Sequence, residues 1–411
     1  MKNDFLPIIL GTDANAYGLA RCFYEEYGIK ALALGKAHLR ETQNSKIIDV
    51  KIFNDLTDNK CFKDILIKVG KEYSAKYNKL ILLSCAEWYT DLIVNNRQAL
   101  EKYYILPFMS KTLKNILEDK ESFYNICEEY NLDYPKTYIV TYENHKNINL
   151  PFDFPVAIKP SSSTNYSKVD FEGKEKSYKA NCCEEMERII NNIYNSPYRS
   201  NVIIQDFIPG NDDTMWVMNC YSDKNGKVKM MCLGRCILEE HTPYGIGNYK
   251  AIISSGNEEL YQKIKVFLEK IKYVGFSNFD LKYDYRDRKY KLFEINIRQG
   301  RSSFFTAAAG CNLAKYLVDD YIFNKDEKIV YNFNKHLWLA TPKRLLKKYV
   351  YNKSVLKEAL DLIKEGKYSY TLKYKKDFSL YRLFWINRIY MKDCRLFKLY
   401  PPKEDEKWNM I

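Results

Sequence analysis

The sequence lacks the features that membrane-spanning, secreted and zinc-binding proteins need. Its 411 residues contain no apolar run of about 18 residues, so we expect no transmembrane helix. The first residues lack the long apolar stretch of a secretory signal. The eleven cysteines form no C-x-x-C pair and follow no regular spacing, which is typical of reduced thiols in the cytoplasm. These absences favour a cytoplasmic protein without a structural zinc site.

Histidines and glycine-rich motifs are also scarce. The chain has four histidines, and no Ser–His–Asp or Cys–His set stands out around them. Gly11 and Gly18 are the only glycines near the turn after the first expected strand, so the dinucleotide-binding pattern G-x-G-x-x-G is absent there. The sequence therefore gives no support to a nucleophilic triad or to a dinucleotide cofactor.

Charge and aromatic side chains are abundant. Charged residues make up 28% and hydrophobic residues 46% of the chain, as in ordinary folded proteins, and the length suggests several subdomains. The net charge is +13, and residues 343–411 hold 18 Lys or Arg against 8 Asp or Glu, which is +10 of that total. Such a region attracts polyanions: nucleic acid, a nucleotide-linked substrate or an anionic membrane. The alternative is a solvated basic face on an appended subdomain.

The first part of the chain alternates strands and helices. Residues 6–10, 29–34 and 80–85 are apolar runs typical of buried strands, and residues 17–27 have helical spacing. This alternation predicts a parallel sheet with helices on its faces. Beyond a boundary near Pro107, residues 111–130 are expected to be helical.

An unusual polar face is expected on one strand. In residues 290–298, alternation places Glu294, Asn296 and Arg298 on one side. Residues 275–282 should pair with it through a charged hairpin, which brings Asp280 toward Glu294. Carboxylate and amide oxygens suit Mg²⁺, and two neighbouring carboxylates repel unless a cation lies between them. The alternative is an edge strand with one solvated face.

Two further segments suit phosphate. Arg301 follows Gly300 and precedes two serines at the expected start of a helix over residues 304–317, which makes an anion site. Lys159 ends a short apolar strand, and the small polar residues 161–165 after it can lie over phosphates. An ordinary polar hairpin is the alternative for the second segment.

Four segments in order carry a resemblance to a known family: FPVAIKPSSST, VIIQDFIPGNDD, FSNFDLKYD and LFEINIRQGRSS. Together they resemble the ATP-grasp superfamily of carboxylate–amine ligases, over roughly residues 110 to 325. The last segment resembles the carbamoyl-phosphate-synthetase-like branch. The opening PIILGTDANAYGLARCFYEEYG further resembles the D-aspartate ligases of low-GC Gram-positive bacteria.

The resemblance implies an α/β protein that is α+β in its catalytic part. A Rossmann-like domain over residues 1–110 would precede an ATP-grasp fold of two subdomains. The first, residues 111–205, would carry a phosphate-covering loop, and the second, residues 206–330, the metal site. Residues 331–411 would form a basic, aromatic C-terminal region.

The resemblance also implies the site residues. ATP would be bound by Lys120, Lys159, Ser161, Ser162, Ser163, Gln205, Asp206, Phe207, Ile208, Asp212 and Asp213. Mg²⁺, with Mn²⁺ as a substitute, would be held by Asp280, Glu294 and Asn296. Arg298, Arg301 and Lys159 would be catalytic, because they would meet the charge of the transferring phosphoryl group.

The chain departs from the family pattern at two places. Asn278 stands where D-alanine–D-alanine ligases have an arginine, so charge stabilisation would fall more heavily on Arg298 and Arg301. Asp212 stands where the family often has a ribose-binding Glu, with Asp213 as a possible substitute. His241 lies between the expected hinge and the metal strands. It is expected either to contact substrate or assist proton transfer, or to be a loop histidine without a role, and Asn278 is a second possible substrate contact.

The implied reaction is ATP-dependent amide formation through an acyl phosphate, with release of ADP. The narrower resemblance suggests D-aspartate, activated at its β-carboxylate, as donor and the Lys ε-amine of a nucleotide-linked peptidoglycan precursor as acceptor. Alternatives are an ATP-grasp ligase that joins another amino acid or small carboxylate to an amine, and a non-catalytic nucleotide-binding protein. Nucleic acid is not an expected partner, because no recognition motif is present.

Residues 378–388 are amphipathic, basic and aromatic. Such a segment can lie on an anionic membrane, which would place the protein at the inner membrane surface. Packing of this segment against the ligase core is the alternative.

Overall fold

The computed structural model describes residues 3–243 and 245–402, apart from the side chains of residues 3, 4, 163 and 164. Within these residues the chain forms two compact units. The larger unit comprises residues 3–114, 211–280 and 296–402, and the smaller comprises residues 115–210 and 281–295. The division into four parts stays a prediction.

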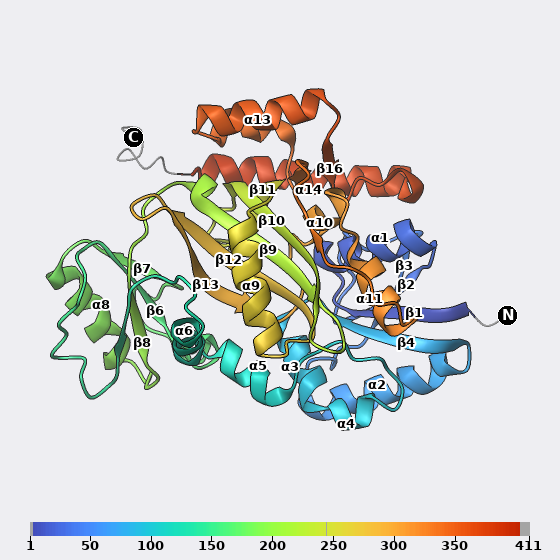
Figure 1. Ribbon diagram of the computed structural model, residues 1–411, viewed down its shortest axis with the longest axis horizontal. Helices are drawn as coiled ribbons and strands as arrows, with labels where there is room; N and C mark the ends of the chain where they lie inside the picture. The colour runs from blue at the N-terminus through green and yellow to red at the C-terminus, as the bar shows by residue number, and fades with distance from the viewer. Residues whose placement is uncertain (1–2, 244, 403–411) are drawn as a thin grey trace. The chain divides into compact units, whose positions relative to one another are not determined.

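The larger unit begins with a parallel four-stranded sheet, in the order β3-β2-β1-β4 (Figure 1). Its strands are β1 (Asn3–Leu10), β2 (Ala31–Gly35), β3 (Ile48–Ile52) and β4 (Tyr77–Ser84). Successive side chains of β1 enter different cores: Ile9 packs with α1 (Ala14–Tyr27), whereas Ile8 and Leu10 pack with α2 (Asn59–Ser74). Burial on both faces explains why the strand reads as a continuous apolar run.

The turn after β1 fixes where α1 begins. The Asp13 carboxylate accepts hydrogen bonds from the backbone N–H groups of Asn15 and Ala16, which caps the helix. The helix ends at Gly28, whose φ of 66° is left-handed and favours glycine. Two short helices, α3 (Glu87–Asn95) and α4 (Arg97–Leu100), follow β4.

A larger, mostly antiparallel sheet follows in the order β13-β12-β9-β10-β11-β15-β16, with β14 paired to β10. Its strands are β9 (Met215–Ser222), β10 (Val228–Glu239), β11 (Tyr249–Ser255), β12 (Gly275–Asp284), β13 (Lys289–Asn296), β14 (Val330–Tyr331), β15 (Leu337–Leu339) and β16 (Tyr368–Tyr370). In Figure 1, α9 (Glu258–Lys270) lies in front of this sheet. The expected pairing of β12 with β13 through a charged hairpin is present.

The expected helix over residues 304–317 is two helices, α10 (Phe304–Ala308) and α11 (Leu313–Tyr321). The chain breaks at Gly310, whose φ of 103° is outside the helical region. Both helices share a core with α1 and with the large sheet, through Phe305 and Leu317 among others. This core joins the first sheet to the second within the larger unit.

The smaller unit is built on an antiparallel sheet in the order β5-β8-β6-β7. Its strands are β5 (Thr137–Val140), β6 (Val156–Pro160), β7 (Tyr178–Ala180) and β8 (Val202–Asp206). Ile190 of α8 (Cys183–Asn195) packs against Val156 and Ile158 of β6. The expected helix over residues 111–130 is divided into α5 (Lys111–Glu118) and α6 (Lys120–Glu129), because Asp119 caps a new helix.

The C-terminal part of the larger unit carries α12 (Leu346–Tyr349), α13 (Lys353–Lys364) and α14 (Leu380–Leu399). The first residue of the inner face of α14, Arg382, ion-pairs with Asp377 at 2.9 Å, and these side chains are 2% and 0% exposed. Tyr17 of α1 donates a hydrogen bond to Asp377 at 2.7 Å. One face of α14 therefore packs against the larger unit, as the second alternative expected. Among the described residues, no helix has the length and apolar character needed to cross a membrane.

Replacing Arg382 by methionine should destabilise the protein strongly. The substitution leaves the buried Asp377 carboxylate without its counter-charge, which costs about 3–5 kcal/mol. Urea unfolding of Arg382→Met measures this. The matched control is Lys364→Met, whose exposed ion pair with Asp361 is 3.4 Å long and should contribute about 1 kcal/mol or less. Equal effects of the two substitutions would contradict the anchoring role of Arg382.

Candidate functional site

The polar face of β12 and the end of β13 come together in the larger unit. Asn296 donates from Nδ2 to Asp280 Oδ2 at 3.0 Å and to Asn278 Oδ1 at 3.1 Å. The Tyr249 hydroxyl donates to Asp280 Oδ1 at 2.9 Å, and Asn278 donates to Asn219 at 3.1 Å. Because Asn296 uses its amide N–H groups to hold its neighbours, its carbonyl oxygen is turned away from Asp280. Asp280 and Asn296 carry oxygens of the kind that a hard cation prefers, and both would reach one ion only if the Asn296 amide turned its oxygen toward Asp280.

Glu294 belongs to the smaller unit. It lies on β13 two positions before Asn296, so both side chains leave the strand on the same side, and it is exposed. The structure therefore brings Asn278, Asp280 and Asn296 together, and the role of Glu294 as the third ligand stays a prediction. No group of three or more His, Cys, Asp or Glu able to hold a metal occurs within the described ranges.

Arg298 is held at the carboxyl end of β4. Its Nη2 atom lies 3.1 Å from Glu87 Oε1, and its Nη1 atom donates to the Gln299 carbonyl at 2.9 Å. The next residue, Gly300, approaches Asn278 so closely that an added Cβ would lie 2.6 Å from Nδ2. Glu87 was missed in the sequence, although residues after parallel strands are typical positions for binding groups.

Arg301 is exposed, and its Nη1 atom donates to Asn248 Oδ1 at 3.2 Å. It precedes α10, which has five residues. The two predicted catalytic arginines therefore differ: Arg298 contacts the Glu87 carboxylate, the Gln299 carbonyl and, at 3.4 Å, Asn296 Oδ1, whereas the exposed Arg301 donates to the neutral Asn248.

In the smaller unit, Lys159 on β6 makes no ion pair with any described residue. Its ammonium group lies 3.5 Å from Gln205 Oε1 and 4.7 Å from the centre of the Phe293 ring. Burial first, and then the charge of Lys120, lower the pKa of Lys159 to about 8 against an opposite effect of Glu294. Lys176 and Lys282 add to the lowering.

These lysines form a cluster of positive charge, which we call the lysine cluster: Lys120, Lys159, Lys176 and Lys282. Such a cluster fits a polyanion, because a bound anion would relieve the repulsion among them. Lys176 and Lys282 were not predicted as site residues. Lys282 also donates to the Gly210 carbonyl at 3.2 Å. Its position two residues after Asp280 on the same strand could have identified it as a site residue.

The predicted phosphate-covering serines lie at the start of α7 (Ser163–Ser167). The Ser162 hydroxyl accepts from the Asn165 N–H at 3.2 Å and caps this helix, and the Ser161 N–H donates to the Asn201 carbonyl at 2.9 Å. The side chain of Ser163 lies outside the described part. Lys120 is the first residue of α6.

The predicted adenine hinge, residues 205–208, begins on β8. Gln205 is buried and faces Lys159, whereas the next side chain, Asp206, forms a two-pronged ion pair with Arg286 at 2.7 and 3.0 Å. Phe207 lies under Lys179 at 4.3 Å and Lys282 at 5.6 Å, and Ile208 is buried.

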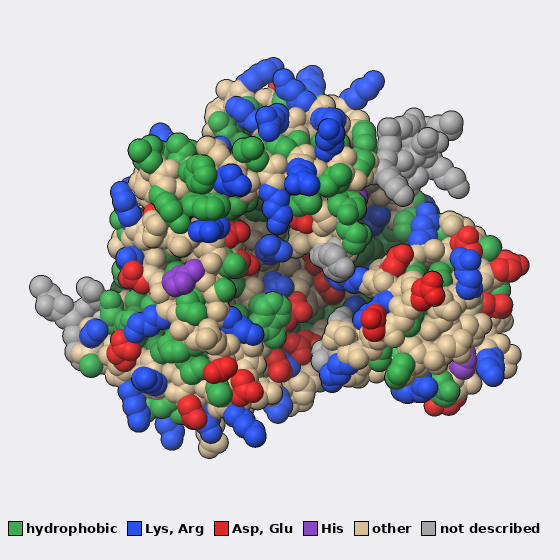
Figure 2. All heavy atoms as spheres, turned by 180° about the vertical axis from the view of Figure 1, so that it is seen from behind, with side chains coloured by type: hydrophobic (Ala, Val, Ile, Leu, Met, Phe, Trp, Pro, Cys, Tyr) green, Lys and Arg blue, Asp and Glu red, His purple; other side chains and the backbone are tan. Residues whose placement is uncertain are grey.

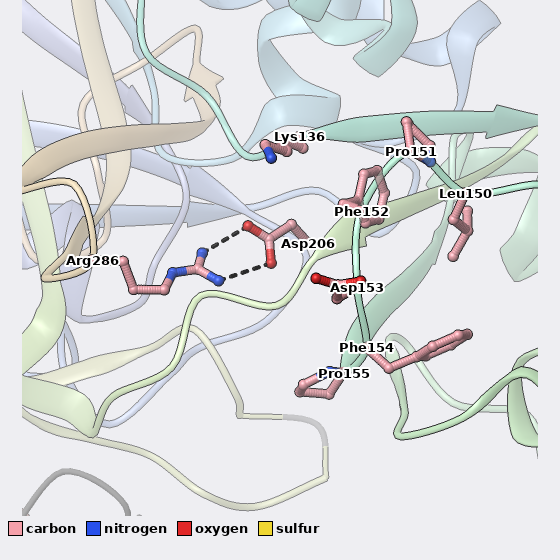
Figure 3. A pocket seen from close by; sticks show the side chains of 9 residues that line it. All are labelled: Lys136, Leu150, Pro151, Phe152, Asp153, Phe154, Pro155, Asp206 and Arg286. Atoms are coloured by element: carbon pink, nitrogen blue, oxygen red, sulfur yellow. Dashed lines mark hydrogen bonds and ion pairs between the residues drawn. The ribbon is translucent and has the colours of Figure 1, made fainter.

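Asp206 and Arg286 line a pocket of about 330 Å³ within the smaller unit (Figure 3). The other lining residues are Lys136, Leu150, Pro151, Phe152, Asp153, Phe154 and Pro155. Neighbouring side chains on a strand point to opposite faces, so this pocket and the lysine cluster lie on different sides of β8. Arg286 was not predicted, because its partner is 80 positions away in the sequence.

Both predicted ribose acids already have partners in the larger unit. Asp212 accepts from the Glu239 N–H at 2.8 Å and lies 2.8 Å from His241 Nε2. Asp213 ion-pairs with Arg235 at 2.7 Å and accepts from Asn352 at 2.8 Å. A ribose hydroxyl at either acid would have to exchange with one of these contacts.

His241 is held beside Asp212. Burial lowers the pKa of His241, but the hydrogen bond and the charge of Asp212 raise it, and the net direction is upward. The pairing favours the charged imidazolium, which suits a positioning role in the loop before β11. Whether substrate reaches this histidine stays a prediction.

Comparison with known proteins relates this chain to a characterised family. No family model matches it. It is 44% identical over 400 residues to the D-aspartate ligase of Enterococcus faecium (strain Aus0004), which covers 95% of this chain and 94% of that protein. The chain belongs to the D-aspartate ligase family. This membership confirms the predicted enzyme class, an ATP-dependent ligase that forms an amide bond.

Solved structures show the same fold at low identity. The L-amino acid ligase of Bacillus licheniformis is 15% identical with a TM-score of 0.54, covering 78% of this chain and 74% of that one. The N5-carboxyaminoimidazole synthetase of Staphylococcus aureus, complexed with ADP, is 13% identical with a TM-score of 0.57, covering 82% of each chain. These likenesses confirm the ATP-grasp fold expected from the motifs.

Lys159 should titrate well below an unperturbed lysine. Lys159 should lose its charge as the pH rises through about 8, whereas an unperturbed lysine does so near about 10.4. Nuclear magnetic resonance of ¹³C-dimethylated lysines measures this, and Lys159→Arg identifies the resonance by its disappearance. If the resonance that is absent from Lys159→Arg titrates in the ordinary lysine range in the parent protein, burial does not lower the pKa of Lys159.

Proposed function

We propose that this protein joins the β-carboxylate of D-aspartate to the ε-amine of the lysine in a nucleotide-linked peptidoglycan precursor, and converts ATP to ADP and phosphate. The single observation that carries the donor is the 44% identity to a D-aspartate ligase over 95% of the chain. The acceptor rests on the resemblance and on the basic C-terminal region, which suits a polyanionic substrate.

The reaction has two chemical steps. A carboxylate oxygen of the donor attacks the γ-phosphorus of ATP, and the bond from that phosphorus to the ADP oxygen breaks. The amine then attacks the acyl carbon of the resulting acyl phosphate and loses a proton, while the carbon–oxygen bond breaks and phosphate leaves. The first step joins two anions, so it needs positive charge at the reacting oxygens.

The lysine cluster supports a triphosphate site. We propose that Lys120 and Lys159 bind the ATP phosphates and that Ser161, Ser162 and Ser163 lie over them. Protonated Lys159 would neutralise charge on the transferring phosphoryl group. Because the pKa of Lys159 is about 8 without ligand, its charge is present well below that pH, is half lost at it, and disappears as the pH rises further.

The adenine and ribose would be held by the hinge and by the acids after it. We propose that backbone groups of residues 205–208 read the base, because Gln205 shares the Lys159 face of β8. Asp212 or Asp213 would reach the ribose by exchanging a present hydrogen bond.

Asp280, Glu294 and Asn296 would hold Mg²⁺, with Mn²⁺ as a substitute, and the ion would supply charge neutralisation between ATP and the donor. Arg298 would meet the charge of the acyl phosphate from a position fixed by Glu87, and Arg301 would add to it. Asn278 would orient Asn296 through their 3.1 Å hydrogen bond, and it is the candidate with His241 for a substrate contact.

The protein is proposed to work in the cytoplasm on a small amino acid donor and an amine acceptor, without nucleic acid. All eleven cysteines are free, four of them exposed or partly exposed, which suits a reducing compartment.

Purified protein given ATP, Mg²⁺ and the nucleotide-linked pentapeptide should add one aspartyl residue from D-aspartate. L-Aspartate is the matched control and should be used at least about tenfold less well, since a site built for one enantiomer leaves polar groups unpaired with the other. Mass spectrometry of the product measures this. Addition of a different amino acid only would favour the broader ATP-grasp alternative, and absence of ADP release with any pair would favour a non-catalytic nucleotide binder.

Glu294→Gln should lower turnover by about 100-fold or more, because it removes a charge that the proposed metal site needs. ADP release measures turnover, and an unchanged melting temperature shows that the fold is kept. Glu258→Gln, at an exposed glutamate of α9, is the control and should retain activity. Near-normal turnover of Glu294→Gln would remove this residue from the metal set.

A further inference from the structure

The helix α14 presents two different faces. Its inner face, which includes Arg382, Ile386, Tyr390 and Phe397, is buried in the larger unit. Its outer face begins with large apolar side chains that remain in solvent: Leu380 is 78%, Phe384 54% and Met391 63% exposed. Phe378, Tyr381 and Leu383 beside them are exposed as well. Large apolar side chains gathered on one exposed face indicate an interaction surface.

The second half of the outer face is basic. Arg388, Lys392, Arg395 and Lys398 are all exposed and recur at helical spacing. The single acid of α14, Asp393, points inward, where it is buried and ion-paired with Lys250 at 3.2 Å. The outer face of α14 therefore carries apolar and positive side chains and no acid.

Neighbouring segments extend this charge. Three exposed lysines, Lys373, Lys375 and Lys376, lie directly before α14. In Figure 2, Lys and Arg side chains gather over the upper part of the view, which α13 and α14 form in Figure 1, with hydrophobic side chains among them. The combined surface, here called the α14 surface, consists of the outer face of α14 and these lysines.

The α14 surface is held in place rather than loosely attached. The Arg382–Asp377 ion pair anchors the first turn of the helix, and Arg382 also donates to the carbonyls of Glu41 and Gln43 at 3.1 and 3.0 Å. The Arg40 guanidinium lies 3.7 Å from the centre of the Trp385 ring. The inner face is buried in this unit, while the apolar side chains of the outer face remain exposed.

We propose that the α14 surface docks the protein on an anionic membrane surface. The leading apolar and aromatic side chains would enter the region between headgroups and acyl chains, while the basic side chains would meet the anionic headgroups. The helix would lie along the membrane.

The composition of the α14 surface favours an anionic membrane over a second copy of this chain and over a nucleic acid. A second copy of this chain, placed face to face, would bring two positive surfaces together without acids to pair with them. A nucleic acid would satisfy the basic residues, but it would leave Leu380, Phe384 and Met391 in water. An anionic membrane accommodates both halves of the surface.

The test is flotation of the full-length protein with vesicles of phosphatidylglycerol and phosphatidylcholine, and with vesicles of phosphatidylcholine alone. The parent protein should float with the anionic vesicles, and high salt should weaken this binding. Arg388→Gln with Arg395→Gln should weaken it by about fivefold for each residue removed. Leu380→Ser with Phe384→Ser should weaken it by about tenfold or more.

Matched controls distinguish binding through the α14 surface from nonspecific binding. Phe333→Ser removes a phenylalanine that is also 54% exposed, and Lys63→Gln with Lys68→Gln removes exposed charges from α2. These variants should bind like the parent protein, and melting temperatures should show that all variants are folded. Failure of the parent protein to float, equal losses in the control variants, or a concentration-dependent dimer that these α14 substitutions abolish would overturn the proposal. Because binding is measured without ATP or donor, this outcome is independent of the proposed reaction.

Discussion

The reaction proposed for this chain depends on neutralising negative charge where a phosphoryl group meets a carboxylate. In the smaller unit, Lys159, which we propose for one part of this task, makes no ion pair with any described residue. Burial and neighbouring lysines make its charged form costly, so that its pKa falls to about 8. An anion beside it would lower that cost. The free energy that destabilises the empty lysine cluster thus favours binding of a polyanion.

In the larger unit, the corresponding constraint is a hydrogen-bond network that fixes the polar side chains of β12 and β13. Asn296 holds Asp280 and Asn278 with one amide group, and Asn219 and Tyr249 support these two in turn. A network in which each member has partners restricts side-chain rotation, so little entropy is lost when a ligand binds. One face of the large antiparallel sheet is buried in the core that α10 and α11 share with α1. This packing holds the strands of the sheet in place.

Local patterns in the sequence predicted much of this arrangement. The apolar runs predicted β1, β2 and β4. Alternation along residues 290–298 predicted that Asn296 shares a face with Glu294, and the hairpin predicted that Asp280 approaches Glu294. The contact that the structure shows is between Asp280 and Asn296. The breaks within the expected helices depend on single residues: Asp119 caps α6 and Gly310 turns the chain. Contacts between distant residues could not be predicted, because nothing local distinguishes Glu87 as the partner of Arg298 or Arg286 as the partner of Asp206. The hydrogen bond from Tyr17 to Asp377 likewise depends on how the segment before α14 meets α1.

The central claim is that the donor carboxylate attacks the phosphorus of ATP. D-Aspartate labelled with ¹⁸O in its side-chain carboxylate tests this directly, with mass spectrometry of the phosphate released during ligation. Because the carbon–oxygen bond breaks when the amine attacks, each phosphate should carry one ¹⁸O atom from the donor. Unlabelled phosphate, released in step with amide formation, would contradict an acyl phosphate and the account built on it.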